Sequence, residues 1–194
     1  MTFDLWFPTA ILSEQIKDYK EINKGLLKRV REIKDTVPPG GQTWIGRPYN
    51  TCGTFNIADD SEFSVIISEV TNLVHLYASR LGIDIKRNRF VCTEGWLNVY
   101  NQQDFQEFHH HAGHQFSAVY YIKTPPNSSQ IIFETPLAPD MKPLPITLHS
   151  YITDTRAKYD VTEGQVIVFR SNLRHCVPNH QGTDERISLA FNFD

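Results

Sequence analysis

Three histidines in the second half of the chain are spaced as ligands of one metal ion. His109 and His111 bracket a single residue, and His175 follows far downstream. A β-strand places residues i and i+2 on the same face, so the first two imidazoles can be directed at one ion. A third imidazole from a distant strand would complete one triangular face of an octahedron. The three positions left open are typical of non-haem Fe(II) sites.

A second polar motif, Arg186-Ile187-Ser188, follows His175 after a short interval. On a strand, Arg186 and Ser188 share a face, and the planar guanidinium can form two charge-assisted hydrogen bonds to one carboxylate. Asn98 and Tyr100 are also two residues apart, within an apolar, strand-like stretch. The joint spacing, with each motif beside an apolar, strand-like run, therefore predicts a functional site rather than isolated polar residues.

The order His-x-His, distal His and Arg-x-Ser resembles the signature of the 2-oxoglutarate/Fe(II)-dependent dioxygenase superfamily. Asn98-Val99-Tyr100 resembles the strand with which several of these enzymes hold the oxo-acid. The stretches 107–111 and 116–121 are similar to a prolyl-hydroxylase-like family of oxygenases from phages and bacteria. The resemblance covers roughly residues 90–194, about half of the chain.

This resemblance implies a cofactor, a co-substrate and their ligands. Fe(II) would be held by His109, His111 and His175. The co-substrate 2-oxoglutarate would chelate the metal and bind Arg186, Ser188, Asn98 and Tyr100. With O2, the family's reaction releases succinate and CO2 and oxidises a second substrate.

The sequence departs from the superfamily at the second ligand, where a carboxylate is usual and this chain has His111. His111 can itself be the ligand, which gives a three-histidine site. Glu134 could supply a carboxylate from a neighbouring strand, and Glu107 shares the period-two face of His109 and His111. A site without metal is the remaining alternative.

Composition favours one soluble enzyme domain over residues 1–194. The net charge of −3, with acidic and basic residues interspersed, indicates no nucleic-acid or membrane-binding patch. The apolar runs are too short to span a membrane, and the first residues lack the features of a signal peptide. Three unpatterned cysteines suit a reducing compartment, so we expect a cytoplasmic protein. The oligomeric state is left open.

The hydrophobic period changes along the chain. Apolar residues at three- and four-residue steps predict one helix over 10–34 and a second that begins at Asp60 or Ser61 and ends near Gly82. From residue 88 the period is two. Strands are expected at 89–92, 95–101, 106–111, 115–123, 130–134, 145–152, 158–162, 165–170, 173–177 and 186–193.

This order of elements predicts an α+β, mainly β fold. Residues 88–194 are expected to form a double-stranded β-helix (jelly roll), with residues 1–87 as its N-terminal helical support. Residues 135–150, with four prolines, are expected to form a long loop that shapes the substrate site.

The sequence thus predicts an Fe(II)- and 2-oxoglutarate-dependent oxygenase that hydroxylates a peptide or protein side chain or a small molecule. Two other interpretations stay open. One is a cupin-like, three-histidine dioxygenase that needs no 2-oxoglutarate and would have no use for the Arg186-x-Ser188 motif. The other is a metal-binding jelly roll without catalytic activity.

Overall fold

The computed structural model describes residues 2, 4, 7–40, 43–137, 145 and 147–194. The helices are α1 (Tyr19–Thr36) and α2 (Ser64–Arg80), with short 3-10 turns at Ile57–Asp59 and Ser61–Phe63. The strands are β1 (Leu12–Gln15), β2 (Tyr49–Asn50), β3 (Cys92–Tyr100), β4 (Gln106–His109), β5 (Phe116–Lys123), β6 (Ile131–Glu134), β7 (Arg156–Tyr159), β8 (Gln165–Arg170), β9 (His175–Val177) and β10 (Arg186–Phe193).

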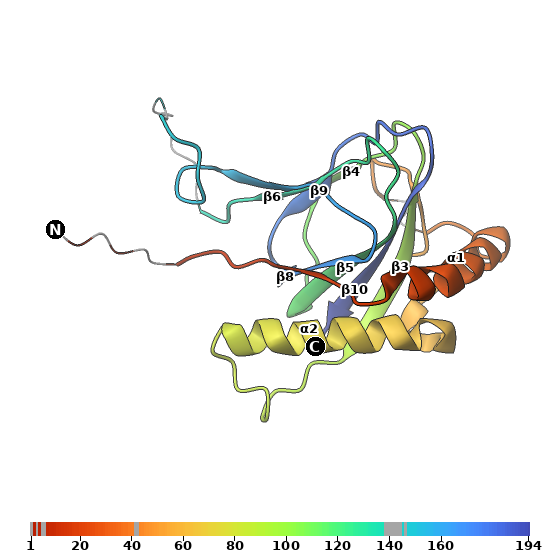
Figure 1. Ribbon diagram of the computed structural model, residues 1–194, viewed down its shortest axis with the longest axis horizontal. Coiled ribbons are helices and arrows are strands. Elements are labelled where there is room, and N and C mark those ends of the chain that lie inside the picture. The colour runs from red at the N-terminus through yellow and green to blue at the C-terminus, as the bar shows by residue number, and fades with distance from the viewer. Residues whose placement is uncertain (1, 3, 5–6, 41–42, 138–144, 146) are drawn as a thin grey trace.

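Two antiparallel sheets form the body of the protein. The larger has the strand order β1-β8-β5-β10-β3-β2, and the smaller has the order β4-β9-β6-β7. The smaller sheet faces one side of the larger, and α1 and α2 cover the other side (Figure 1). This arrangement confirms the predicted jelly roll with helices from the N-terminal part as its support.

Strand β5 shows how side-chain alternation divides the interior into two cores. Ala118, Tyr120 and Ile122 belong to the core beneath the helices, whereas Val119 and Tyr121 belong to the core between the sheets. A strand covered on both faces is mostly apolar, and in β5 every residue from Ala118 to Ile122 is hydrophobic and buried. Each large apolar side chain that is fully buried contributes roughly 1.5–3 kcal/mol to folding.

Strand β10 is central to the larger sheet because it pairs with both β3 and β5. Its register sets Arg186 opposite Tyr100 and Ser188 opposite Asn98 on β3. Ser188 also lies opposite Tyr121 on β5. The four residues predicted to bind the oxo-acid are thereby neighbours on two adjacent strands.

The first predicted helix begins later than its hydrophobic pattern suggests. The chain forms β1 before α1, and β1 pairs with β8 at the edge of the larger sheet. Leu12 and Ile16 are four residues apart, a spacing that fits one face of a helix and equally one face of a strand. Asp18, with a left-handed backbone (φ 56°), separates the two elements. The prediction of one helix over 10–34 was therefore wrong in its first part.

The second helix follows its prediction closely. The Asp60 carboxylate accepts a hydrogen bond from the backbone N–H of Glu62 and caps the 3-10 turn that leads into α2. Gly82, with φ 81°, follows the helix end in the left-handed conformation that favours glycine.

Several strand predictions needed correction. Of the strand expected at 89–92 only Cys92 is in a strand, β3, which also contains most of the strand expected at 95–101. Strand β7 lies earlier than the expected 158–162. The expected strand at 145–152 is wrong for its described residues, which form bends and turns. Leu148 and Tyr151 are largely exposed there, so their apolar character did not indicate a sheet. Half of the loop expected at 135–150 lies outside the described residues.

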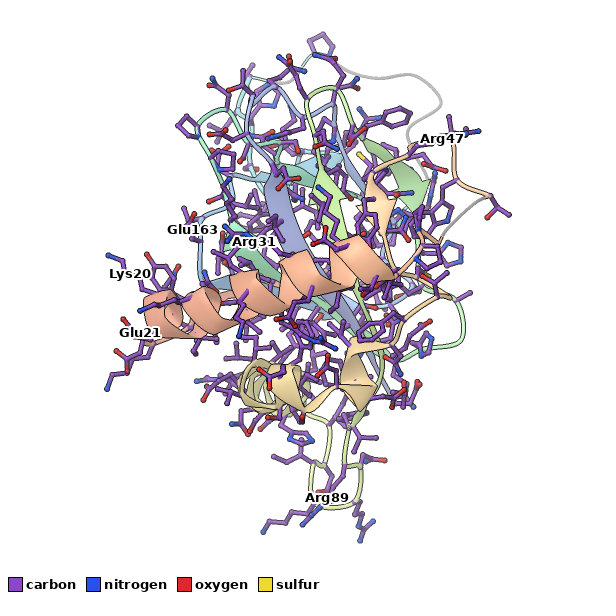
Figure 2. All side chains as sticks on the ribbon, turned by 90° about the vertical axis from the view of Figure 1, so that its right-hand side faces the viewer. Lys20, Glu21, Arg31, Arg47, Arg89 and Glu163 are labelled. Carbon is purple, nitrogen blue, oxygen red and sulfur yellow. The ribbon has the colours of Figure 1, made fainter. Side chains whose placement is uncertain are left out.

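Charged side chains are dispersed over the surface: Lys20 projects outward from α1, and Arg89 projects from the loop that precedes β3 (Figure 2). Among the described residues, no helix is long and apolar enough to cross a membrane.

A buried amide joins α1 to the larger sheet. The Asn23 side chain donates to the backbone carbonyl of Ile122 (2.8 Å) and accepts from the hydroxyl of Tyr120 (2.5 Å). Asn23 is 5% exposed, so water cannot replace it readily. A buried polar group that loses its partner costs roughly 1–3 kcal/mol.

We expect Asn23→Leu to lower the free energy of unfolding by about 2–4 kcal/mol, because it leaves two buried groups without partners. Tyr120→Phe should cost less, since Asn23 keeps its bond to Ile122. Urea denaturation of both variants and the double variant measures the coupling. Strictly additive losses would show that the two side chains do not act together.

Candidate metal centre

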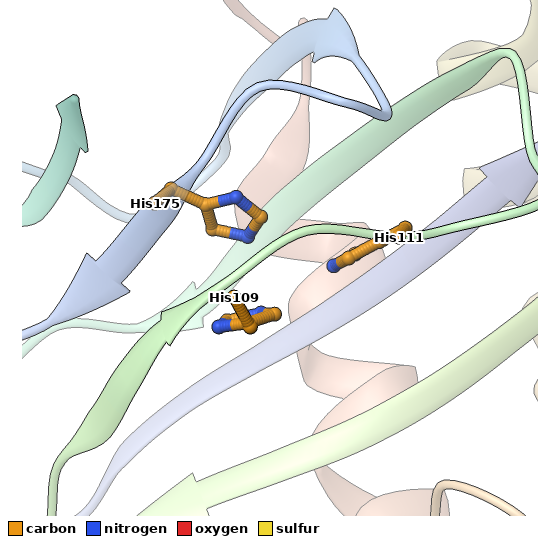
Figure 3. A group of neighbouring side chains, drawn as sticks. All are labelled: His109, His111 and His175. Atoms are coloured by element: carbon orange, nitrogen blue, oxygen red, sulfur yellow. The ribbon is translucent and has the colours of Figure 1, made fainter. Parts of the chain in front are cut away.

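The three predicted histidines converge at one point between the two sheets (Figure 3). One ligand atom from each lies within 4.8 Å of the others, and the described residues contain no other such group of three His, Cys, Asp or Glu side chains. The ring centres of His109 and His175 are 4.3 Å apart, and those of His111 and His175 are 5.1 Å apart. The cluster can therefore surround one ion.

Different elements position the three rings. His109 ends β4, and β9 holds His175 directly opposite it. The strand predicted over 106–111 ends at His109, so His111 lies beyond it and is tied to the sheet by its backbone N–H, which donates to Ser171. The rings of His109 and His111 nevertheless stack with centres 5.4 Å apart.

Backbone carbonyls orient two of the imidazoles. His109 Nδ1 lies 2.8 Å from the carbonyl oxygen of Glu107, and His175 Nδ1 lies 3.0 Å from that of Leu173. A carbonyl oxygen only accepts, so Nδ1 of each ring must carry the proton. The lone pair of each ring is then on Nε2, the atom left for a metal.

Burial keeps the cluster uncharged. Desolvation lowers the pKa of His109, lowers that of His111 to about 4, and lowers that of His175 well below its ordinary value. The proximity of the rings to one another adds to the effect at His111 and His175. At neutral pH all three are neutral, which is the form that binds metal.

The two carboxylates considered as ligands lie elsewhere. Glu107 accepts hydrogen bonds from the backbone N–H groups of Ile45 and Gly46. The pairing of β4 with β9 shifts register between Gln106 and His109, and such an irregularity breaks the period-two rule that would have aligned Glu107 with His109.

Glu134 is on the outer face of the smaller sheet. It forms ion pairs with Arg174 (2.8 Å) and Arg156 (3.8 Å). The preceding residue, Phe133, belongs to the core between the sheets, so alternation turns Glu134 away from the cluster. The donor set that the geometry offers is three imidazoles.

Arg186 lies in the same cavity, with 1% of its surface exposed. Its guanidinium carbon is 4.9 Å from the ring centre of Tyr100 and 5.0 Å from that of Tyr121. Within the described residues it forms no ion pair. A buried cation whose only charge partners are aromatic faces is well suited to an anionic ligand.

The cavity also contains Ser188, Asn98 and Tyr100, as the strand faces predicted. Burial raises the pKa of Tyr100 to about 12, so its hydroxyl stays protonated and can donate. These groups and the histidines line one continuous space between the sheets.

Buried atoms without hydrogen-bond partners concentrate in this cavity. In the described part of the chain there are five, and four belong to residues that line it: His111 Nε2, Arg186 Nε, the Tyr121 hydroxyl and Gln106 Oε1. Such atoms are costly unless a ligand, ion or water satisfies them. A metal ion would bind His111 Nε2, and a carboxylate would accept a hydrogen bond from Arg186 Nε, so these two ligands would satisfy two of the four atoms.

Sequence reasoning missed several residues of the site. Trp44 and Trp96 lie near the rings of His109 and His111, at 5.9 and 5.3 Å between centres. Trp44 is in a loop without periodicity, so no sequence signal pointed to it. Tyr121 could have been found, because it shares the inward face of β5 with Val119. His111 Nδ1 contacts Asn192 and Ser117, which no motif indicated.

The family comparison agrees with this geometry. The family model described as "Putative 2OG-Fe(II) oxygenase" matches residues 94–192, about half of the chain. The chain belongs to this family. It is therefore an oxygenase that depends on Fe(II) and 2-oxoglutarate, and the matched segment contains all three histidines and Arg186. A search of curated protein sequences found no significant match.

Solved structures show the same fold. A prolyl-4-hydroxylase from Pseudomonas putida is 14% identical with a TM-score of 0.64, over 95% of this chain and 92% of that one. The alpha ketoglutarate dependent epimerase SnoN from nogalamycin biosynthesis is 13% identical with a TM-score of 0.65, over 95% and 76%. A viral collagen prolyl hydroxylase from Paramecium Bursaria Chlorella virus-1 is 10% identical with a TM-score of 0.57, over 93% and 94%.

We expect His175→Ala to abolish stoichiometric binding of Fe(II) or Zn(II) at neutral pH, because two imidazoles remain of a three-ligand set. Metal content after dialysis, measured by atomic emission, tests this. His110→Ala is the matched control, since His110 is exposed between two of the proposed ligands. Retention of one tight ion per chain in His175→Ala would remove His175 from the site. Loss of metal in Glu134→Ala with retention in His111→Ala would favour the carboxylate alternative.

The metal-free protein should become less stable as the pH falls from about 7 towards 4. The pKa of His111 is about 4 in the folded protein and 6.5 ordinarily. Because the unfolded chain takes up its proton first, stability is present above the ordinary pKa and is lost as the pH falls below it. This residue accounts for on the order of 3 kcal/mol, at about 1.36 kcal/mol per pKa unit. Denaturation of chelator-treated protein across this range should show a weaker pH dependence in His111→Gln; an identical dependence would contradict the assignment.

Proposed function

We propose that His109, His111 and His175 hold Fe(II) and that Arg186, Ser188, Asn98 and Tyr100 bind 2-oxoglutarate. The observation that carries the proposal is the pair of buried, unsatisfied atoms in one cavity, His111 Nε2 and Arg186 Nε. His111 Nε2 needs a metal or a hydrogen-bond donor, and Arg186 Nε needs a hydrogen-bond acceptor. Iron and 2-oxoglutarate supply those two partners together.

Bound iron and 2-oxoglutarate supply the oxidising chemistry: O2 is consumed, the oxo-acid yields succinate and CO2, and a C–H bond of the second substrate becomes C–OH. The protein's contribution is placement and charge. Three neutral imidazoles leave the +2 charge of the ion uncompensated, and the carboxylate of the co-substrate that binds the metal would offset part of it. Arg186, which is 1% exposed, would pair with the second carboxylate in a buried environment, where an ionic hydrogen bond is strong.

The tyrosines beside Arg186 hold it in place. Their faces attract the cation, and the buried hydroxyl of Tyr121 is a further donor free for a carboxylate. Ser188 lies two residues from Arg186 on the same strand face and adds a hydroxyl. The set is selective for a short dicarboxylic acid with one end at the metal.

We further propose that the oxidised substrate is a peptide or protein side chain, prolyl residues among them, with a small molecule as the alternative. Support for the peptide is the resemblance of residues 107–111 and 116–121 to prolyl-hydroxylase-like enzymes. Incubation with proline-containing peptides and mass spectrometry for the gain of one oxygen atom tests it. Oxidation of small molecules alone would favour the alternative.

We also propose that residues 1–194 act as one oxygenase domain in the cytoplasm. Side chains of both helices share one apolar core with the larger sheet, which supports a common folding unit. The three cysteines are free thiols, as a reducing compartment requires.

Anaerobic titration with Fe(II) and then 2-oxoglutarate tests the function directly. We expect a weak visible absorption band from the iron–oxo-acid chelate, followed by succinate formation when O2 is admitted. Iron binding without the band, together with O2 consumption, would favour a cupin-like three-histidine dioxygenase. Iron binding with neither would identify a metal-binding protein without oxygenase activity.

Arg186→Ala should weaken 2-oxoglutarate binding by about a hundredfold or more, because the second carboxylate would be buried without its partner. Metal binding should be nearly unchanged. Arg186→Lys should recover part of the loss, since it restores the charge but not the planar fork. Isothermal titration with Mn(II) in place of iron measures this without turnover.

The matched control is Arg89→Ala, which removes an exposed guanidinium far from the cavity (Figure 2). It should bind the oxo-acid as the parent does. If Arg186→Ala also binds it with parental affinity, Arg186 is not the carboxylate partner.

A further inference from the structure

A chain of side-chain hydrogen bonds runs from His111 to Glu94 at the rim of the two sheets, where β3 begins. His111 Nδ1 lies 2.6 Å from Asn192 Oδ1, and Asn192 Nδ2 donates to Glu94 Oε2 over 2.9 Å. Asn192 is 2% exposed, and the register of β10 sets it opposite Glu94 on β3 and Ser117 on β5. The contacts therefore follow from strand pairing.

We propose that Asn192, oriented by Glu94, is the positioning residue that presents His111 Nε2 to the metal. The inference rests on the proposed metal site. It concerns how this chain holds the imidazole that stands where the superfamily usually has a carboxylate.

The orientation of the Asn192 amide determines which ring nitrogen of His111 carries the proton. The Glu94 carboxylate only accepts hydrogen bonds, so the amide NH2 must face Glu94 and the amide oxygen must face His111. An oxygen 2.6 Å from Nδ1 requires that Nδ1 carry the proton. The lone pair of the neutral ring is then on Nε2, which is buried in the cavity without a partner among the described residues.

Ser117 is consistent with this assignment. Its hydroxyl donates to Asn192 Oδ1 (2.9 Å), and its oxygen is 2.8 Å from the hydroxyl of Ser171, which can donate to it. Ser117 Oγ is also 2.9 Å from His111 Nδ1. If it donated to Nδ1 instead, Nδ1 and Asn192 Oδ1 would face each other as two acceptors, an arrangement that is repulsive.

His111 depends on side chains because of its place in the fold. His109 and His175 are oriented by backbone carbonyls two residues before them, which almost any sequence provides. His111 lies beyond the end of β4 and has no such carbonyl at Nδ1. Loss of Asn192 should therefore release this ring alone.

Two groups adjoin Glu94 at the rim. His114 Nε2 lies 3.5 Å from its carboxylate, and His114 Nδ1 pairs with Asp194 (2.8 Å). The Glu94 side chain is 39% exposed, so water screens its charge. Its main contribution is to fix which end of the Asn192 amide faces His111.

The test measures the tautomer and the metal affinity separately. In metal-free protein with 15N-labelled histidine, the imidazole nitrogen shifts distinguish a proton on Nδ1 from one on Nε2, and His111→Gln assigns the His111 signals. We expect the proton on Nδ1 in the parent. Asn192→Leu, of similar size but without an acceptor, should give a mixture of tautomers and about 10- to 100-fold weaker Zn(II) binding in competition with a chromophoric chelator.

A second variant separates positioning from packing. In the double variant Asn192→Asp/Glu94→Gln, a carboxylate accepts from His111 and an amide at position 94 can donate to it, so the relay is rebuilt with donor and acceptor exchanged. It should restore Zn(II) affinity to within about tenfold of the parent, above that of Asn192→Leu. Thr93→Val is the control: it removes a hydroxyl bonded to Asp194 (3.0 Å) and to the backbone carbonyl of Asn192 (3.5 Å), and it leaves every side-chain contact of the relay in place.

Three outcomes would each overturn the inference. They are parental Zn(II) affinity in Asn192→Leu, failure of the double variant to recover Zn(II) affinity, and a proton on His111 Nε2 in the parent. A parent that has the expected tautomer but binds no Zn(II) at the three histidines would instead refute the proposed metal site. The two failures are thus distinguishable.

Discussion

Burial of a cation without an acidic partner is the constraint on which the interior depends. Arg186 is enclosed by the two sheets, and in the described residues only aromatic faces accompany its charge. Desolvation of an ion is costly, so such a site is stable only if its surroundings are rigid and a ligand completes it. Binding of an anion should therefore stabilise the fold as well as fill the site.

The same closed interior sets the properties of the histidines. Removal from water makes protonation unfavourable, so the rings remain neutral and their lone pairs are available. The cavity thus combines three neutral imidazoles that can bind a cation with a guanidinium that can bind an anion. A chelating dicarboxylic acid on a metal ion satisfies both, which is why the geometry and the family membership support one function.

Strand pairing converts short sequence spacings into this arrangement. Period-two alternation in β10 places Arg186, Ser188 and Asn192 on the strand face that is turned towards the smaller sheet. Pairing with β3 brings Asn98 and Tyr100 beside Ser188 and Arg186. The fold class, the second helix and the main strands were predictable because their hydrophobic periods are long and regular. The segment before α1 was not, because Leu12 and Ile16 fit a helix or a strand and only pairing with β8 selects the strand.

The sequence by itself determined the candidate ligands, the guanidinium and the alternation that makes Arg186 and Ser188 face inward, because these properties depend on residue type and local spacing. Only the tertiary structure decided that Glu107 and Glu134 lie outside the cluster, since a register shift and an outward strand face are consequences of pairing. It alone revealed Trp44 and the Asn192–Glu94 relay. Their contacts join residues distant in sequence, and no local period encodes a contact that exists only after the sheets have closed.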